Sequence, residues 1–166
     1  IKGANGAFVN GYVQGNGTTS LIKITNPGVI ILNGQLKGEG NSTTESNDSW
    51  LKIQGDKFYA FNGTTTVCPK GFDPAENSCE GELPEGGGKL GWFKAYRTGG
   101  DVSQFIWSTK TSDRDPHDIY AQFSEAGTYT VQISGRSTHH IIDRFIITND
   151  PTMHEAAKNQ DESARE

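Results

Sequence analysis

Short runs that alternate hydrophobic and polar residues dominate the chain, and each run ends at Gly, Asn, Asp, Pro or Ser. In VIILNGQLKG, residues 29–38, the side chains of Ile30, Leu32 and Leu36 share one face and polar residues share the other. This period of two is typical of a half-buried β-strand. No segment shows the spacing of a strong amphipathic helix, so the pattern predicts an all-β protein.

About ten such runs occur in a chain that has 21 glycines and only 33% hydrophobic residues. The expected strands are residues 6–13, 20–25, 29–38, 49–55, 57–63, 90–96, 103–111, 117–123, 128–135 and 141–148. So many short strands joined by polar turns favour an antiparallel β-sandwich, and we predict a jelly roll.

Two of these runs echo each other, NPGVIILNGQLKG and EAGTYTVQISGRS. Each has a turn, an alternating strand and a Gly near the strand's end, and in the second run Tyr129, Val131 and Ile133 share one face. The period does not recur, so this is not a solenoid repeat. We interpret the two runs as equivalent strands in the two halves of a sandwich.

The length of 166 residues fits a single domain. We assign residues 1–150 to one β-sandwich. Residues 62–90 have little hydrophobic content and are expected to form a long surface excursion from it. Residues 151–166 have no hydrophobic stripe, which predicts a linker or a short docked helix.

The formal net charge is −5, and no basic face is evident. Duplex nucleic acid or an anionic membrane would need such a face, so neither partner is expected. No hydrophobic run approaches the roughly 20 residues of a membrane helix. No signal peptide is recognisable, and the chain begins abruptly at Ile1 in what reads as folded sequence. We therefore expect a mature or excised piece of a longer secreted protein, monomeric in solution.

The two cysteines lie in CPKGFDPAENSC, with ten residues between Cys68 and Cys79. A disulfide across this polar loop would stabilise the protein by roughly 2–3 kcal/mol and would imply an oxidising compartment. The alternative is a pair of free thiols in a cytosolic protein. A metal site would need further ligands, which no other Cys and no nearby His supplies.

Aromatic residues are concentrated between residues 50 and 107. Sugar rings stack their C–H faces on aromatic side chains, while their hydroxyl groups need polar partners. Alternation places at least half of these aromatic residues in the core. Trp107 is the strongest candidate for a ligand contact because a polar loop follows it directly, and Trp92 and Tyr96 are further candidates.

The segment SDRDPHD, residues 112–118, holds three aspartates and a histidine within seven residues. Oxygen ligands at such density are what Ca²⁺ prefers, although the spacing of an EF-hand loop is missing. The alternative is an acidic turn shaped by Pro116. We expect Asp115 and His117 to contribute to the rim of a ligand site.

The segment SGRSTHHIIDRF, residues 134–145, places two histidines side by side. On a strand, His139 and His140 would point to opposite faces, so they could not both bind one metal ion. No G-x-S-x-G motif is present, and no pair of catalytic carboxylates can be recognised, so catalysis is not expected. Of Asp143 and Arg144, one is expected to face inward and to be paired.

The order of these pieces resembles a family 6-type carbohydrate-binding module or a malectin-like domain. The similar parts are GAFVNGYVQGNGTTSLIKITNPGVIILNGQLKGEGNSTTESNDSWLKIQG and FIWSTKTSDRDPHDIYAQFSEAGTYTVQISGRSTHHIIDRFIITND. The resemblance implies a β-jelly roll that binds polysaccharide and is attached to the catalytic domain of a secreted glycoside hydrolase or lyase. Agar- or alginate-like substrates, as for an agarase, fit the closing motif.

The resemblance also implies a ligand site in loops at one end of the sandwich. Trp107 matches one of the family's stacking aromatics, and His139 and His140 lie where a polar ligand contact, often Asn, is found. A structural calcium is common in the family, but the acidic first strand that holds it is missing here.

The hypothesis is therefore a non-catalytic carbohydrate-binding module. In it, Trp107 supplies the stacking platform, while Arg136, His139 and His140 supply hydrogen bonds. The alternative is a protein-interaction or structural β-sandwich domain of a larger secreted protein. A small lyase or hydrolase is a third possibility, which we do not expect.

Overall fold

The computed structural model describes residues 2–3, 6–10, 18–24, 27–38, 46–83, 88–99, 101 and 103–148. Within these ranges the chain forms strands and turns and no helix. The strands make two sheets, so the predicted antiparallel β-sandwich is confirmed. The tail 151–166 lies outside the described residues.

The first sheet, called sheet A here, has the strand order β1-β3-β12-β5-β9-β8. Its strands are β1 (Lys2–Gly3), β3 (Thr18–Ile24), β12 (Gly127–Gly135), β5 (Asp48–Ile53), β9 (Trp92–Tyr96) and β8 (Gly88–Lys89). Every pairing between these strands is antiparallel except that of β1 with β3.

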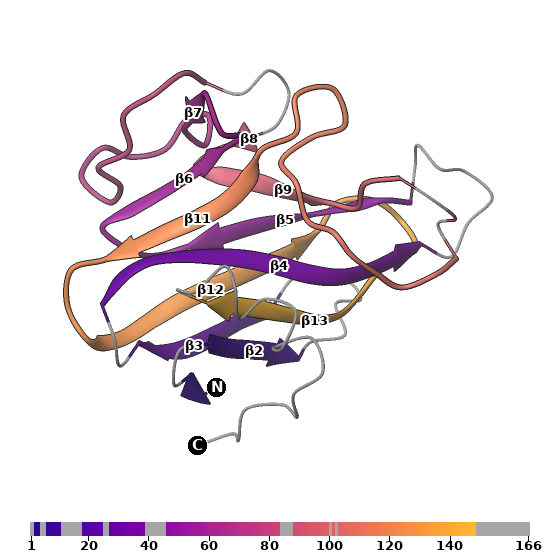
Figure 1. Cartoon of the computed structure of the whole chain (residues 1–166), viewed down its shortest axis with the longest axis horizontal. Helices are drawn as coiled ribbons and strands as arrows, with labels where there is room; N and C mark the ends of the chain where they lie inside the picture. The colour runs from indigo at the N-terminus through magenta and orange to yellow at the C-terminus, as the bar shows by residue number, and fades with distance from the viewer. Residues whose placement is uncertain are drawn as a thin grey trace.

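The second sheet, sheet B, has the order β2-β13-β4-β11-β6-β7, and β10 also pairs with β4. Its strands are β2 (Gly6–Asn10), β13 (His140–Thr148), β4 (Gly28–Gly38), β11 (Asp118–Phe123), β6 (Lys57–Phe61), β7 (Thr66–Val67) and β10 (Ile106–Trp107). In Figure 1 the long strand β4 crosses the molecule, with β11 and β6 above it and β13 and β2 below it.

The core lies between the two sheets and follows the predicted alternation. Ile30, Leu32 and Leu36 of β4 are buried, whereas the residues between them, apart from Gly34, are half-buried on the outer face. In β12, Val131 and Ile133 are buried, and Tyr129 packs against the same core. Strands β4 and β12 each occupy the third position in their sheet, which agrees with the interpretation of the two runs as equivalent strands.

Strand β13 corrects the prediction for its two charged residues. A β-bulge between Ile142 and Arg144 shifts the register against β4. As a result neither charge faces inward: the side chains of Asp143 and Arg144 are 39% and 27% exposed. They pair with each other, because Arg144 Nε donates to Asp143 Oδ2 over 2.9 Å. A bulge adds one residue to the strand and so breaks the alternation that the prediction assumed.

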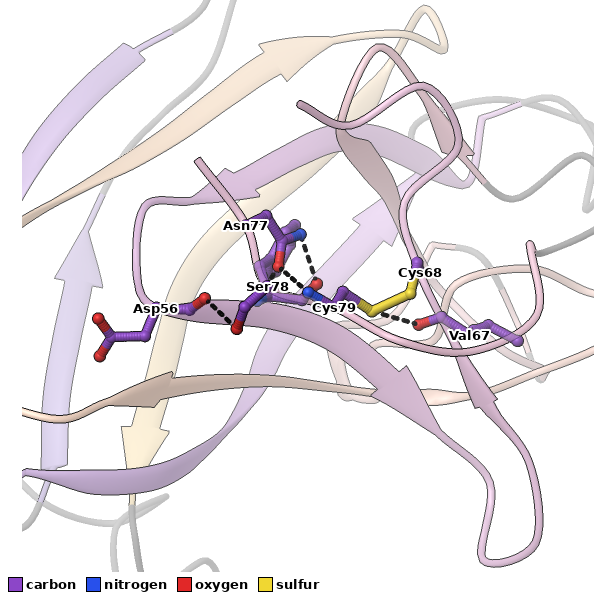
Figure 2. The surroundings of a disulfide bond; sticks show 7 residues. Asp56, Val67, Cys68, Asn77, Ser78 and Cys79 are labelled. Atoms are coloured by element: carbon purple, nitrogen blue, oxygen red, sulfur yellow. Dashed lines mark hydrogen bonds between the residues drawn. A yellow bond between two sulfur atoms is a disulfide. The ribbon is translucent and has the colours of Figure 1, made fainter. Parts of the chain in front are cut away.

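The excursion 62–90 is fastened by the predicted disulfide, Cys68–Cys79. Figure 2 shows Asn77 beside this bond. The buried Asn77 side chain accepts hydrogen bonds from the backbone N–H groups of Phe58 and Cys79 and donates one to the Phe58 carbonyl. The excursion also contains β7 and β8, one in each sheet. The segment is therefore integrated into the sandwich.

Candidate functional site

A buried carboxylate organises the end of the sandwich at which β5 begins, to the right in Figure 1. Asp48 begins β5, and its side chain is only 3% exposed. Nη1 of Arg136 lies 2.7 Å from both carboxylate oxygens, and the Ser137 hydroxyl also donates to Oδ1. Nζ of Lys94 lies 3.7 Å from Oδ2. One buried negative charge is thus faced by two cations, which offsets the cost of its burial.

The two adjacent histidines lie on opposite sides of the chain, as expected. His139 is exposed in the turn before β13 and has a positive φ of 65°. His140 is 6% exposed, and its Nδ1 lies 2.8 Å from the Ser49 hydroxyl. A ligand on the surface can therefore contact His139, whereas His140 lies between the sheets.

Arg97, which the sequence analysis did not single out, is 2% exposed and directly follows β9. Its guanidinium donates to the carbonyls of Leu36, Gly99, Asp101 and Gln104. Burial lowers the pKa of Arg97. The side chain fixes the loop that leads from β9 to β10. No sequence pattern marks an arginine for such burial, because its partners are backbone carbonyls, three in the loop that follows it and one in the distant strand β4.

Three aromatic residues lie on the outer face of sheet A. In β5, Leu51 and Ile53 are buried, so Trp50 and Lys52 point outward. In β9, Phe93 and Ala95 are buried, so their neighbours point outward. Trp50, Trp92 and Tyr96 are all half-buried and form what we call the aromatic row. Trp50 was not among the predicted contacts, although the alternation in SWLKI already indicated its outward position.

The register of sheet A sets the order of the aromatic row. Trp50 is directly opposite Lys94, so it is diagonal to Trp92 and Tyr96 on β9. Such diagonal neighbours lie about 7–8 Å apart, within reach of large side chains. Trp92 and Tyr96 are four residues apart on one strand, which corresponds to about 14 Å. The row therefore runs along the strands.

Charged side chains lie between the aromatic residues of this face. Lys89 of β8 pairs with Trp92, and Lys94 pairs with Trp50. The guanidinium of Arg136 lies 5.4 Å from the ring centroid of Trp50, a distance at which a cation–π interaction forms. Each tryptophan of the row therefore has a basic neighbour on an adjacent strand or loop.

Tyr96 ends the row beside Asp48, its partner in the β5–β9 register. The pKa of Tyr96 is raised, mainly because burial disfavours the phenolate, and additionally by the negative charges of Asp113 and Asp48. The phenol therefore stays protonated at neutral pH and can donate a hydrogen bond. Two backbone hydrogen bonds between Tyr96 and Lys110 place the start of the loop 111–117 next to this end of the row.

That loop is closed by backbone hydrogen bonding between Thr111 and His117, with 3.1 Å from N to O. His117 is fully buried, and its Nδ1 lies 2.9 Å from the Asp115 carbonyl oxygen. The Asp115 carboxylate is 3.6 Å from the same ring nitrogen and is 51% exposed. Asp115 is thus accessible at the surface, and His117 supports the loop from inside.

Trp107 lies on the other sheet. It pairs with Gln35 of β4 and packs against Ile146 of β13 on the outer face of sheet B. The structure therefore brings Arg136, Trp92 and Tyr96 onto one face and places Trp107 on the opposite one. The loop and strand positions implied by the resemblance do not converge on a single site.

No three metal-ligating side chains come together in the described ranges. A structural calcium, for which the acidic segment 112–118 is the candidate in this sequence, stays a prediction. Across the same residues, the structure has no helix with the length and hydrophobicity needed to cross a membrane.

Comparison with known proteins finds no matching family model, no matching curated protein and no matching solved structure.

Proposed function

We propose that the protein is a non-catalytic carbohydrate-binding domain whose ligand lies along the outer face of sheet A. The observation that carries this proposal is the aromatic row: Trp50, Trp92 and Tyr96 are half-exposed on adjacent strands of one sheet. Large aromatic side chains that stay partly exposed on the outer face of a sheet can bury more surface against a partner, so they favour one that covers them.

A sugar chain fits the geometry of this row. The C–H faces of pyranose rings stack on indole and phenol rings, and successive rings can follow the diagonal from Trp92 through Trp50 to Tyr96. Because β-strands are rigid, the aromatic side chains need little ordering when a ligand binds.

Fixed polar groups stand beside the row and can bind sugar hydroxyls. Arg136 is held by Asp48, and its side chain is still 37% exposed. The phenol of Tyr96 is protonated at neutral pH, as tyrosine ordinarily is, and can donate a hydrogen bond. His139 lies exposed in the adjoining turn. Arg136, His139, Trp92 and Tyr96 from the sequence analysis therefore remain in the proposed site, and Trp50 joins them.

The cellular context proposed is extracellular. The disulfide Cys68–Cys79 favours an oxidising compartment. We propose that the domain is a monomeric jelly-roll module that holds an attached glycoside hydrolase or lyase on its polysaccharide. The resemblance to family 6-type and malectin-like modules supports this reading.

Affinity electrophoresis through gels that contain agarose, alginate, carrageenan, xylan or laminarin tests the proposal. Retardation by one polymer is expected for the wild-type protein and should be lost in Trp50→Ala and Trp92→Ala. Trp107→Ala is the matched control, because Trp107 lies on the outer face of sheet B. Thermal melting of all three variants separates lost binding from lost folding.

Two results would favour other functions. Unretarded migration in every gel would contradict carbohydrate binding and favour the protein-interaction domain. Release of reducing ends from any polymer would contradict the non-catalytic assignment.

A further inference from the structure

The outer face of sheet A differs in charge from the rest of the protein. The chain has a formal net charge of −5. Beside Trp50 and Trp92, however, four basic side chains gather, from three strands and a loop. They are Lys52, Lys89, Lys94 and Arg136. Among the described residues, Asp48, Glu76 and Asp73 are carboxylates near these basic side chains, Asp73 and Glu76 both lining a pocket beside Lys52, and Asp113 lies nearer Tyr96.

The Asp48 cluster leaves a positive charge in excess beside Trp50. Asp48 carries one negative charge, and both Arg136 and Lys94 are within ion-pair distance of it. The Asp48 side chain is 3% exposed, whereas those of Arg136 and Lys94 are 37% and 14% exposed, so a ligand on this face meets the cations before the carboxylate. An anionic group placed over Lys94 would complete the second ion pair without displacing Asp48.

A second basic position surrounds Trp92. Lys89 is exposed and pairs with Trp92 from one side. Lys52 lies on the other side, because it follows Leu51 and Trp92 precedes Phe93, and Leu51 pairs with Phe93. Its ammonium is 3.0 Å from Glu76, whose side chain is 60% exposed, so this ion pair is solvated and readily exchanged.

A small pocket of about 20 Å³ lies next to Lys52, between β5 and the disulfide loop. This volume holds one or two water molecules. The pocket therefore cannot receive a sugar ring.

We infer that the ligand is an acidic polysaccharide, with carboxylate or sulfate groups that contact Lys94 and Lys89 beside the stacked rings. This inference rests on the proposed function and specifies its ligand class. Single-stranded nucleic acid also combines rings with anions. The disulfide and the acidic remainder of the protein favour a polysaccharide outside the cell.

Polymers that share a backbone and differ in charge provide the test. Polygalacturonate is compared with its fully methyl-esterified form, and carrageenan with agarose, in affinity gels at two NaCl concentrations. Alginate, laminarin and poly(dT) are run beside them. We expect the wild-type protein to bind at least one acidic polymer more tightly than its neutral counterpart. Added NaCl should weaken this binding, because salt screens exposed charges.

The variants Lys89→Met and Lys94→Met should each weaken that binding about two- to fivefold. Lys57→Met is the matched control, since Lys57 stands over Tyr59 on the outer face of sheet B and should leave the affinity unchanged.

The other possible results overturn either the acidic ligand class or the proposed function. Equal, salt-independent binding of acidic and neutral polymers would leave carbohydrate binding intact and overturn the acidic ligand. Unchanged affinity in both lysine variants would also overturn the acidic ligand and leave carbohydrate binding intact. Tighter binding of poly(dT) would replace the polysaccharide by nucleic acid. Binding of no polymer at all would overturn the proposed function itself.

Discussion

Nδ1 of His140 lies 2.8 Å from Oγ of Ser49, and this hydrogen bond joins β13 of sheet B to β5 of sheet A. Both residues are buried, and Nε2 of His140 has no partner among the described residues. Desolvation lowers the pKa of His140 to about 4, and Arg97 adds to the effect while Asp48 opposes it. The imidazole is therefore neutral at physiological pH.

Acidification should destabilise the protein through His140. The unfolded chain has an ordinary histidine pKa near 6.5, so it takes up a proton before the folded protein does as the pH falls. The contribution of neutral His140 to the free energy of unfolding is therefore fully present above about pH 6.5. As the pH falls, this contribution decreases until about pH 4, where the folded protein also takes up the proton. The loss is about 3 kcal/mol over this window. Urea unfolding at pH 7 and pH 4.5, followed by tryptophan fluorescence, measures it.

His140→Gln removes this titration. The variant should be less stable at pH 7 but should lose clearly less stability than the wild type on acidification. His139→Gln is the control, since His139 is exposed in the preceding turn. If His140→Gln showed the full acid loss, His140 would not be its source.

Asp48→Asn should cost about 2–3 kcal/mol in the free energy of unfolding, the size of the charge-assisted hydrogen bonds that it weakens. The amide keeps the size of the side chain but leaves Arg136 and Lys94 without their counter-charge. Asp143→Asn removes a carboxylate from an exposed pair and should cost about 0–1 kcal/mol. Chemical denaturation measures the free energy of unfolding of both variants. Equal losses in the two would mean that the Asp48 cluster stabilises the protein no more than a surface ion pair does.

Local features of this fold could be predicted from the sequence. Alternation placed Leu32 and Val131 in the core, and the polar loop between Cys68 and Cys79 indicated a disulfide. These predictions depend only on neighbours along the chain. The interpretation of the two similar runs as equivalent strands also agrees with the positions of β4 and β12, because each is the third strand of its sheet.

Positions across strands could not be predicted in the same way. Trp50 becomes part of a row only because the register sets it opposite Lys94, and register depends on loops whose length and course the sequence does not reveal. Trp107 was selected for its polar neighbours, yet β10 pairs with β4 and turns it toward Ile146. The bulge before Arg144 sets this residue opposite Gln35, so its side chain points outward and not toward the core.

Gly34→Ala should be strongly destabilising, by about 3 kcal/mol. A Cβ at this position would lie 2.6 Å from Cε1 of Phe145 and 2.7 Å from Oγ1 of Thr109. Thr109 is itself held in place, because it accepts the Gly34 backbone N–H over 2.7 Å. Phe145→Leu makes room, so the double variant should lose less stability than the sum of the two single losses. Additive losses in thermal or urea unfolding would show that the close contact is not the cause.

Reduction of Cys68–Cys79 should lower the free energy of unfolding by about 3 kcal/mol, since the bond closes a loop over a sequence separation of 11. The folded structure should persist, because Asn77 still holds the loop to β6 through its three hydrogen bonds with the backbone of Phe58 and Cys79. Thermal unfolding with and without reductant measures the loss. The Cys68→Ala/Cys79→Ala double variant should match the reduced protein and should not respond to reductant. A wild-type protein whose melting temperature is unaffected by full reduction would show that Asn77 and the buried contacts of the loop suffice, and that the disulfide adds no stability.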